Sequence, residues 1–370
     1  MANKKKAKKN RKKQLVGRIV IFVLLLLCLI GIIFMIWRLQ GKEQESGKDV
    51  PAVTATPAPE SSVTPEATPT ATPSPTPETS AIDTSELYSK YAVLYRVDGD
   101  EKELLLDVKG DERMSPASMT KMMTALVLLE QLGGDLNQEV TVDADMFDEL
   151  YAEQASLAGF SPDEVVPAID LLYGVMLPSG GECSMALARK TCGSEEALVD
   201  LMNQKAQELG MEDTHFVNVT GLYDPDHYST AKDIATLLQY ALQNDQFRQI
   251  FETDRYSTSS TNKHPDGITF KSSMFSKMTD YSVNGGEIRG GKTGYHDEAG
   301  LCLASEALIG GEEYILVTAG AEGSGYTNPY HIMDAFMIYN QVDPDGMKGT
   351  GEAILIETED TDEANGNAAA

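Results

Sequence analysis

The sequence predicts an α+β domain in which one antiparallel sheet is backed by helices. Paired strand-like runs lie near both ends of the region between residues 83 and 345, and helical patterns fill the middle. Strands joined by short turns at the two ends of a domain, with helices between them, are typical of a single sheet covered by helices. The rest of the chain has the composition of non-globular sequence.

Turn residues define the two expected hairpins. The first surrounds Asp98-Gly99, between β-rich runs at Tyr91–Val97 and Glu103–Asp107. The second surrounds Ile309-Gly310-Gly311-Glu312, between Leu301–Leu308 and Glu313–Gly320. Both pairs are predicted to belong to the one sheet.

Helical periodicity dominates the middle of the domain. Apolar residues recur at helical spacing from Ser118 to Gln131, and Gly133-Gly134 follows as a stop signal. Thr230 with Asp233 three residues later is a capping-box pattern. Further helices are predicted over residues 167–177, 184–191, 195–209, 231–243 and 330–342.

The amino-terminal segment has the pattern of a membrane anchor. Residues 1–18 carry nine Lys and Arg and no acid, and residues 19–37 are uncharged and almost wholly apolar. That run is long enough for a transmembrane helix, whereas a cleaved signal peptide, the alternative, has a shorter apolar core. The basic block indicates a cytoplasmic amino terminus and places the following chain outside the cytoplasm.

Two further segments are expected to lie outside the fold. Residues 38–82 form a linker dominated by Pro and Thr, which cannot bury a core and favours an extended chain. Residues 346–370 are an acidic tail. The domain of residues 83–345 is therefore expected to stand away from the membrane on a semi-rigid stalk.

Charge and cysteine usage narrow the functional classes. All 57 acidic residues lie beyond residue 40 with only 20 of the 30 Lys and Arg, so that part carries a formal charge of −37. Such a surface argues against a nucleic-acid partner and favours a soluble monomer. Cys183, Cys192 and Cys302 lie in the domain and are interpreted as buried thiols, although export permits disulfides.

The first candidate catalytic group is Ser118-Met119-Thr120-Lys121. A spacing of three on a helix brings the serine hydroxyl and the lysine amine to one face. A neutral lysine could then accept the serine proton. The tetrad alone is weak evidence, because most such pairs are incidental.

Two more motifs follow in sequence. Lys292-Thr293-Gly294 follows a glycine-rich run, where small residues permit close approach and Lys and Thr can meet a carboxylate. Ser179 lies in a Pro-Ser-Gly-Gly turn and could relay a proton, although helix capping is the ordinary role of such a serine. S-x-x-K, a loop serine and K-T-G in this order form the three-part signature of penicillin-binding proteins and class A β-lactamases.

On these residues the chain resembles the low-molecular-mass D-alanyl-D-alanine carboxypeptidases. The runs around Ser118, Ser179 and Lys292 are similar to that family, as are Phe216–Leu222 and Tyr228–Asp233. The resemblance implies a β-lactamase/transpeptidase-like fold with a helical subdomain. It also implies removal of the terminal D-alanine from peptidoglycan stem peptides, covalent inhibition by β-lactam antibiotics, and a location on the cell-wall side of a bacterial membrane.

The resemblance also implies a role for each motif residue. Ser118 would be the nucleophile, Lys121 its general base, and Ser179 a proton shuttle. The N–H groups of Ser118 and Tyr295 would hold the oxyanion. The residues expected to bind substrate are Lys292, Thr293, Gly294 and Tyr295.

One departure keeps two alternatives open. The family's second motif is Ser-x-Asn, but Gly181 occupies the third position here, where Glu182 or a backbone group would have to substitute. A non-catalytic or weakly active wall-binding or regulatory homologue is therefore one alternative, and a serine β-lactamase is a less favoured one. No cofactor is expected, because the five histidines show no metal-ligand spacing.

Overall fold

The protein was analysed as a computed structural model, which describes residues 82–342. The predicted basic tail, transmembrane helix and acidic tail lie outside these residues, as does the linker up to residue 81. Within residues 82–342, no helix has the length and apolar character needed to cross a bilayer.

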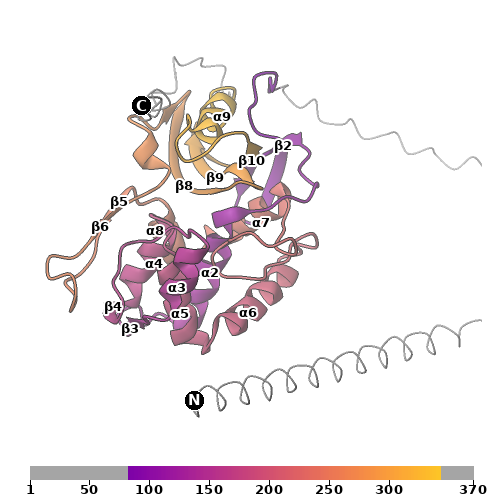
Figure 1. The fold of residues 1–370 in the computed structure, drawn as a ribbon. Helices are drawn as coiled ribbons and strands as arrows, with labels where there is room; N and C mark the ends of the chain where they lie inside the picture. Colours follow the sequence, from indigo (N-terminus) through magenta and orange to yellow (C-terminus); the bar gives the residue numbers. More distant parts are fainter. Residues whose placement is uncertain (1–81, 343–370) are drawn as a thin grey trace, which may run out of the picture. The chain divides into compact units, whose positions relative to one another are not determined.

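A six-stranded sheet forms the centre of the described fold, with strand order β2-β1-β10-β9-β8-β7 and all neighbours antiparallel (Figure 1). The first and last strands in sequence therefore lie side by side, as the paired runs predicted. The strands are β1 (Tyr91–Asp98), β2 (Glu101–Val108), β7 (Ser282–Val283), β8 (Gly286–His296), β9 (Gly300–Ile309) and β10 (Glu312–Ala321).

Alternation along the strands gives the sheet two buried faces. In β1, Val93 and Tyr95 join the larger core cluster, whereas Ala92 and Leu94 join the smaller one on the opposite face. Successive side chains of a strand point to opposite faces, so central strands covered on both sides carry continuous apolar runs. This explains why the strand runs in the sequence show little polar alternation.

Helices cover these two faces unequally. The last helix, α9, packs on β9 and β10 and closes the smaller core, while α7 packs on β1 and β10 within the larger one. The larger core extends into a helical group, α2 to α6, which lies beside the sheet (Figure 1). The helices are α2 (Thr120–Leu132), α3 (Met146–Ala152), α4 (Ala168–Met176), α5 (Gly181–Cys192), α6 (Glu195–Glu208), α7 (Ala231–Ala241), α8 (Asp245–Phe251) and α9 (Tyr330–Tyr339).

Most predicted elements are confirmed, with three corrections. Ser118 is not in the long helix but in a short 3-10 turn, η1 (Ala117–Met119), directly before it. The last helix ends at Tyr339 and not at Val342. The capping box is half formed: the Asp233 N–H donates to Thr230 Oγ1 at 3.1 Å, but the Asp233 carboxylate accepts from Thr214 instead.

Several short elements were missed, because they are too short to show a period. They include the short helices α3 and α8 and two small two-stranded sheets, one formed by β3 and β4 and the other by β5 and β6. The bounds of the strands and of the turn η2, also missed, are β3 (Glu139–Val142), β4 (Glu164–Pro167), β5 (Arg255–Ser257), β6 (Thr269–Lys271) and η2 (Phe275–Lys277). The interpretation of the cysteines is largely correct. Cys183 and Cys302 are buried free thiols, while Cys192 is a half-buried one.

Candidate active site

Ser118 lies where the sheet meets the helical group. It occupies the η1 turn, which packs against β8, and its side chain is half-buried. The preceding residue, Ala117, has φ of 45°, a conformation that is costly for a residue with a Cβ. The turn that carries the serine is therefore held in a strained shape by its surroundings.

Two glycines provide those surroundings. A Cβ added at Gly221, which has φ of +79°, would lie 2.0 Å from the Ala117 carbonyl oxygen. A Cβ at Gly294 would lie 3.1 Å from the Ser118 nitrogen. Only glycine allows both segments to approach so closely, so these two positions fix the backbone of the serine from two sides.

Lys121 is the buried partner of Ser118. Its Nζ lies 3.3 Å from Ser118 Oγ and donates to the Thr220 carbonyl oxygen at 2.5 Å. The side chain is only 3% exposed, and this burial lowers the pKa of the amine to about 8, although the nearby Glu182 opposes the shift. An appreciable fraction of the amine is therefore neutral near pH 7 and able to accept a proton.

The carbonyl that holds Lys121 was not singled out from the sequence. It belongs to a turn organised by Asn218, whose Oδ1 accepts the N–H groups of Thr220 at 3.2 Å and Gly221 at 2.7 Å. An asparagine that caps its own turn two and three residues later is a recognisable pattern. The N-x-x-G spacing was the signal that could have predicted this turn.

Lys292 and Ser179 form a second buried pair. Lys292 Nζ donates to Ser179 Oγ at 3.0 Å and to the Thr293 carbonyl oxygen at 2.9 Å. Lys292 is fully buried, and burial together with the Lys121 charge places its pKa well below that of a free lysine. The capping role considered for Ser179 is wrong, because α5 starts from Gly180 without a side-chain cap.

The remaining predicted residues follow Lys292 along β8. Thr293 Oγ1 shares a hydrogen bond of 2.5 Å with Ser273 Oγ. Gly294 packs on the serine turn, and Tyr295 is 38% exposed with its hydroxyl donating to Asp297. Ser273 was another residue that the sequence did not indicate.

Two hollows meet at Ser118, and both are lined by Ser118, Ser156 and Tyr295. The smaller, of about 260 Å³, reaches Thr293 and Lys277, and the described residues that line it include no acid. The larger, of about 410 Å³, reaches Lys121 and the turn at 220–223 and is also lined by the acids Glu153, Asp297 and Glu298. All seven predicted site residues thus lie at or directly behind one cleft.

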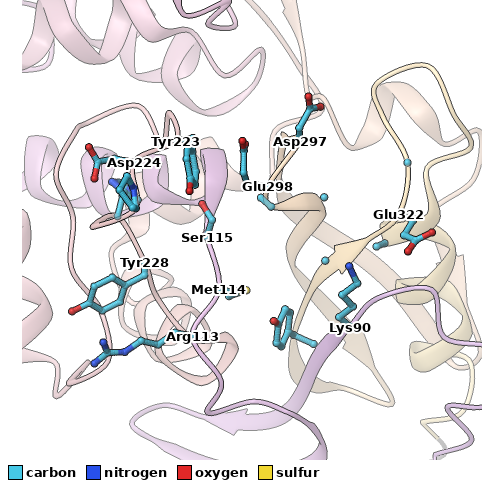
Figure 2. Close-up of a pocket in the computed structure, with 18 residues that line it drawn as sticks. Lys90, Arg113, Met114, Ser115, Tyr223, Asp224, Tyr228, Asp297, Glu298 and Glu322 are labelled. Carbon is cyan, nitrogen blue, oxygen red and sulfur yellow. The ribbon is translucent and has the colours of Figure 1, made fainter.

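The larger hollow borders a further pocket of about 540 Å³. The two share Tyr223, Asp297 and Glu298 (Figure 2). Figure 2 shows Lys90 and Arg113 on this pocket's far walls, where Arg113 lies next to the Tyr228 ring. The groove beside Ser118 is therefore long enough for an extended ligand.

The suggestion that Glu182 replaces the missing amide is not supported. Glu182 is fully buried and lines neither hollow. Its Oε1 instead accepts the N–H groups of Ala158 at 2.7 Å and Gly159 at 2.9 Å, and burial raises its pKa. Within residues 82–342 no group of three or more His, Cys, Asp and Glu residues could hold a metal ion.

Known proteins are similar to this chain in sequence and in fold. Residues 78–323 match the family described as D-alanyl-D-alanine carboxypeptidase. The D-alanyl-D-alanine carboxypeptidase DacF of Bacillus subtilis (strain 168) is 32% identical over 244 residues, which cover 64% of this chain and 59% of the relative. The D-alanyl-D-alanine carboxypeptidase of Streptomyces sp. (strain K15) is 34% identical over 214 residues, covering 56% of this chain and 72% of the relative.

Solved structures agree with the sequence relatives. The Streptomyces K15 DD-transpeptidase crystal structure has a TM-score of 0.61 at 29% identity and covers 69% of this chain and 97% of that one. The D-alanyl-D-alanine carboxypeptidase of Mycobacterium tuberculosis H37Rv has a TM-score of 0.57 at 25% identity, covering 70% and 92%. The fold and the site thus define a member of the penicillin-binding class of serine proteins. The chain belongs to the D-alanyl-D-alanine carboxypeptidase family.

Proposed function

We propose that this protein is a serine-type D-Ala-D-Ala carboxypeptidase that trims peptidoglycan stem peptides and is acylated by penicillins. The observation that carries the proposal is the position of Lys121. Its amine lies between Ser118 Oγ and a backbone carbonyl, in a site dry enough to lower its pKa to about 8. The chain spans 59% of the length of the Bacillus relative, and the family match over residues 78–323 contains all seven predicted site residues.

Acylation follows from this geometry. Neutral Lys121 takes the hydroxyl proton as Ser118 Oγ attacks the carbonyl carbon of the D-Ala-D-Ala peptide bond. The N–H groups of Ser118 and Tyr295 stabilise the oxyanion. Ser179, bound to Lys292, passes its hydroxyl proton to the leaving nitrogen and receives in return the proton that Lys121 had taken, so that Lys121 is neutral again. The C–N bond breaks, and free D-alanine departs, leaving Ser118 as an ester.

Hydrolysis of the ester uses Lys121 and Ser118 again, with water as the attacking group and Ser118 as the leaving group. Water attacks the ester carbonyl while Lys121 accepts its proton, and the proton then returns to Ser118 Oγ as the shortened peptide leaves. A penicillin follows the first half of this path. Its ring nitrogen stays attached to the acyl group after the C–N bond breaks and blocks the approach of water, so the ester is long-lived.

The charges along the cleft favour one orientation of the bound stem peptide. The smaller hollow is lined by Lys277 and Thr293 and by no acid among the described residues, which suits the terminal carboxylate. The larger hollow, with Glu153, Asp297 and Glu298, suits the remainder of the stem peptide. The acids of the larger hollow repel an anion, and Lys277 in the smaller hollow attracts one.

The two alternatives are less well supported. A serine β-lactamase would need an acid that activates the deacylating water. The acids lining the two hollows all lie outside the segment between Ser179 and Lys292, where such a loop would follow the second motif. A non-catalytic homologue is favoured only by Gly181, while both lysines keep their serine contacts.

We further propose that residues 19–37 anchor the protein in the cell membrane as a single-pass helix. The basic residues before this segment favour an amino terminus in the cytoplasm. The Pro/Thr-rich linker of residues 38–82 would then carry the catalytic domain toward the cell wall, where its substrate is found.

Labelling with a fluorescent penicillin tests the proposal. The wild type is expected to form a covalent adduct and to release D-alanine from a synthetic stem pentapeptide. Ser118→Ala should do neither, and Lys121→Ala should label at least 100-fold more slowly. An adduct that persists in Ser118→Ala would contradict the nucleophile, and rapid penicillin turnover by the wild type would favour the β-lactamase.

A further inference from the structure

The segment of residues 153–160, here named the cleft loop, connects α3 to β4 and forms one wall of the cleft. Its Ser156 lines both hollows together with Ser118 and Tyr295. The side chain is exposed, and no hydrogen bond of its hydroxyl is found within residues 82–342. A polar group is thus presented to the cleft without a partner from the described part of the chain.

The cleft loop packs closely against Gly181. A Cβ added at Gly181 would lie 3.4 Å from the Ser156 carbonyl oxygen and 3.5 Å from Ala155 Cβ, which are ordinary contact distances, and 2.7 Å from Leu150 Cδ2 in α3, which would have to shift. With glycine at position 181, the start of α5 has no side chain of its own to offer at this point, and the cleft loop is the neighbouring segment that faces the cleft.

Three hydrogen bonds fix the loop against the start of α5. The Gly181 N–H donates to the Ser156 carbonyl oxygen at 2.8 Å. The buried Glu182 carboxylate accepts from Ala158 and Gly159. Bonds to a buried carboxylate are stronger than neutral ones, so Ser156 is held in place and does not sample many positions.

The opposite wall of the cleft is a strand edge. β8 pairs with β9 along its whole length, but β7 pairs only with Gly286 and Glu287. Within the described residues, the stretch from Lys292 to His296 therefore has no strand on its other edge. An extended peptide can add to such an edge through backbone hydrogen bonds.

A peptide bound in this way has polar groups on both sides. Successive residues of an extended chain direct their N–H and C=O groups to opposite sides, so only half of them meet β8. The others face the cleft loop, where a group removed from water without a partner costs free energy. Glu153 and Gln154 line only the larger hollow, whereas Ser156 is the polar side chain of the cleft loop that lines both hollows with Ser118.

We propose that the Ser156 hydroxyl donates a hydrogen bond to the amide carbonyl of the acyl donor that faces away from β8. This carbonyl belongs to the peptide bond preceding the residue that acylates Ser118. Ser156 thus takes over, from the cleft loop, the contact that a side chain at position 181 cannot make. This inference rests on the proposed function, because it assigns a residue to the same substrate.

Two penicillins distinguish this contact from a general effect on the loop. Benzylpenicillin carries a side-chain amide, whereas 6-aminopenicillanic acid has a free amine in its place. Ser156→Ala should lower the second-order acylation rate constant about 3- to 10-fold for benzylpenicillin, the effect of one neutral hydrogen bond. The rate constant for 6-aminopenicillanic acid should not change.

Two further variants serve as controls. Ser156→Thr keeps the hydroxyl and should restore most of the rate with benzylpenicillin. Ser260→Ala removes an exposed serine that lines neither hollow, in the segment between β5 and β6, and should affect neither compound.

Equal losses for the two penicillins, or no loss for either, would overturn the role of Ser156 while leaving the proposed function intact. A wild-type protein that neither penicillin acylates would instead overturn the proposed function.

Discussion

The pH dependence of acylation tests the role of Lys121 most directly. Only the unprotonated amine can accept the Ser118 proton, so the rate should follow the neutral fraction of Lys121. With a pKa of about 8, roughly 1% of the amine is neutral at pH 6, about 10% at pH 7 and about half at pH 8. The acylation rate constant should rise about tenfold from pH 6 to pH 7, about fivefold from pH 7 to pH 8, and level off near pH 9.

The same shift has a consequence for stability. The pKa of Lys121 is about 8 in the folded protein and near 10.5 in an unfolded chain, so between these values the unfolded state binds more protons. The free energy of unfolding should therefore increase as pH rises from 8 to 10.5, by at most roughly 3 kcal/mol. Lys121→Met has a similar volume and should lose the part of the increase due to Lys121, while the part due to Lys292, whose pKa is also lowered, remains.

Stopped-flow labelling with a fluorescent penicillin between pH 6 and pH 9 measures the acylation profile, and spontaneous hydrolysis of the compound is subtracted at each pH. Chemical denaturation over pH 8 to 10 measures the stability. A rate constant that is flat between pH 6 and pH 8 would refute Lys121 as the base, even if Lys121→Ala were inactive.

Two further substitutions probe the surroundings of Ser118 and Lys121. Glu182→Gln removes a charge that favours protonated Lys121, so the midpoint of the acylation profile should move to lower pH; an unchanged midpoint would contradict this coupling. Gly221→Ala places a Cβ against the Ala117 carbonyl and should slow penicillin acylation about 100-fold by displacing the serine turn. The matched control, Gly133→Ala, also has positive φ but open space around it; it should cost about 1 kcal/mol in thermal unfolding and leave acylation unchanged.

The sequence was sufficient for the frame of the fold and for the pair of Ser118 and Lys121. Long strands such as β9 and β10 and a helix as long as α2 carry enough residues to show their type. Ser118 and Lys121 were predictable as neighbours because their spacing is local. That Lys292 and Ser179, 113 positions apart, belong to one cleft came instead from the order of the motifs, and their direct hydrogen bond was not predicted.

What the sequence could not supply were the contacts made by backbone atoms. The Thr220 carbonyl acts through its position and not its side chain, so its identity as a threonine says nothing about Lys121. The same holds for Ser156, whose carbonyl oxygen binds Gly181. The missing Asn at position 181 suggested a defect, whereas in the structure Leu150 of α3 and the cleft loop occupy the space next to Gly181.

The close contact of Ala117 with Gly221 has a consequence for how the protein matures. The backbone of Ser118 is fixed by two separate chain segments, at Gly221 and Gly294, each more than 70 residues away in the sequence. A fragment of the chain that lacks either segment therefore cannot form the serine turn. Reactivity should appear only when the sheet and the helical group have docked on each other. Under the proposed export and acylation, the serine should stay unreactive until the domain has folded, and a penicillin adduct should mark chains that have finished folding.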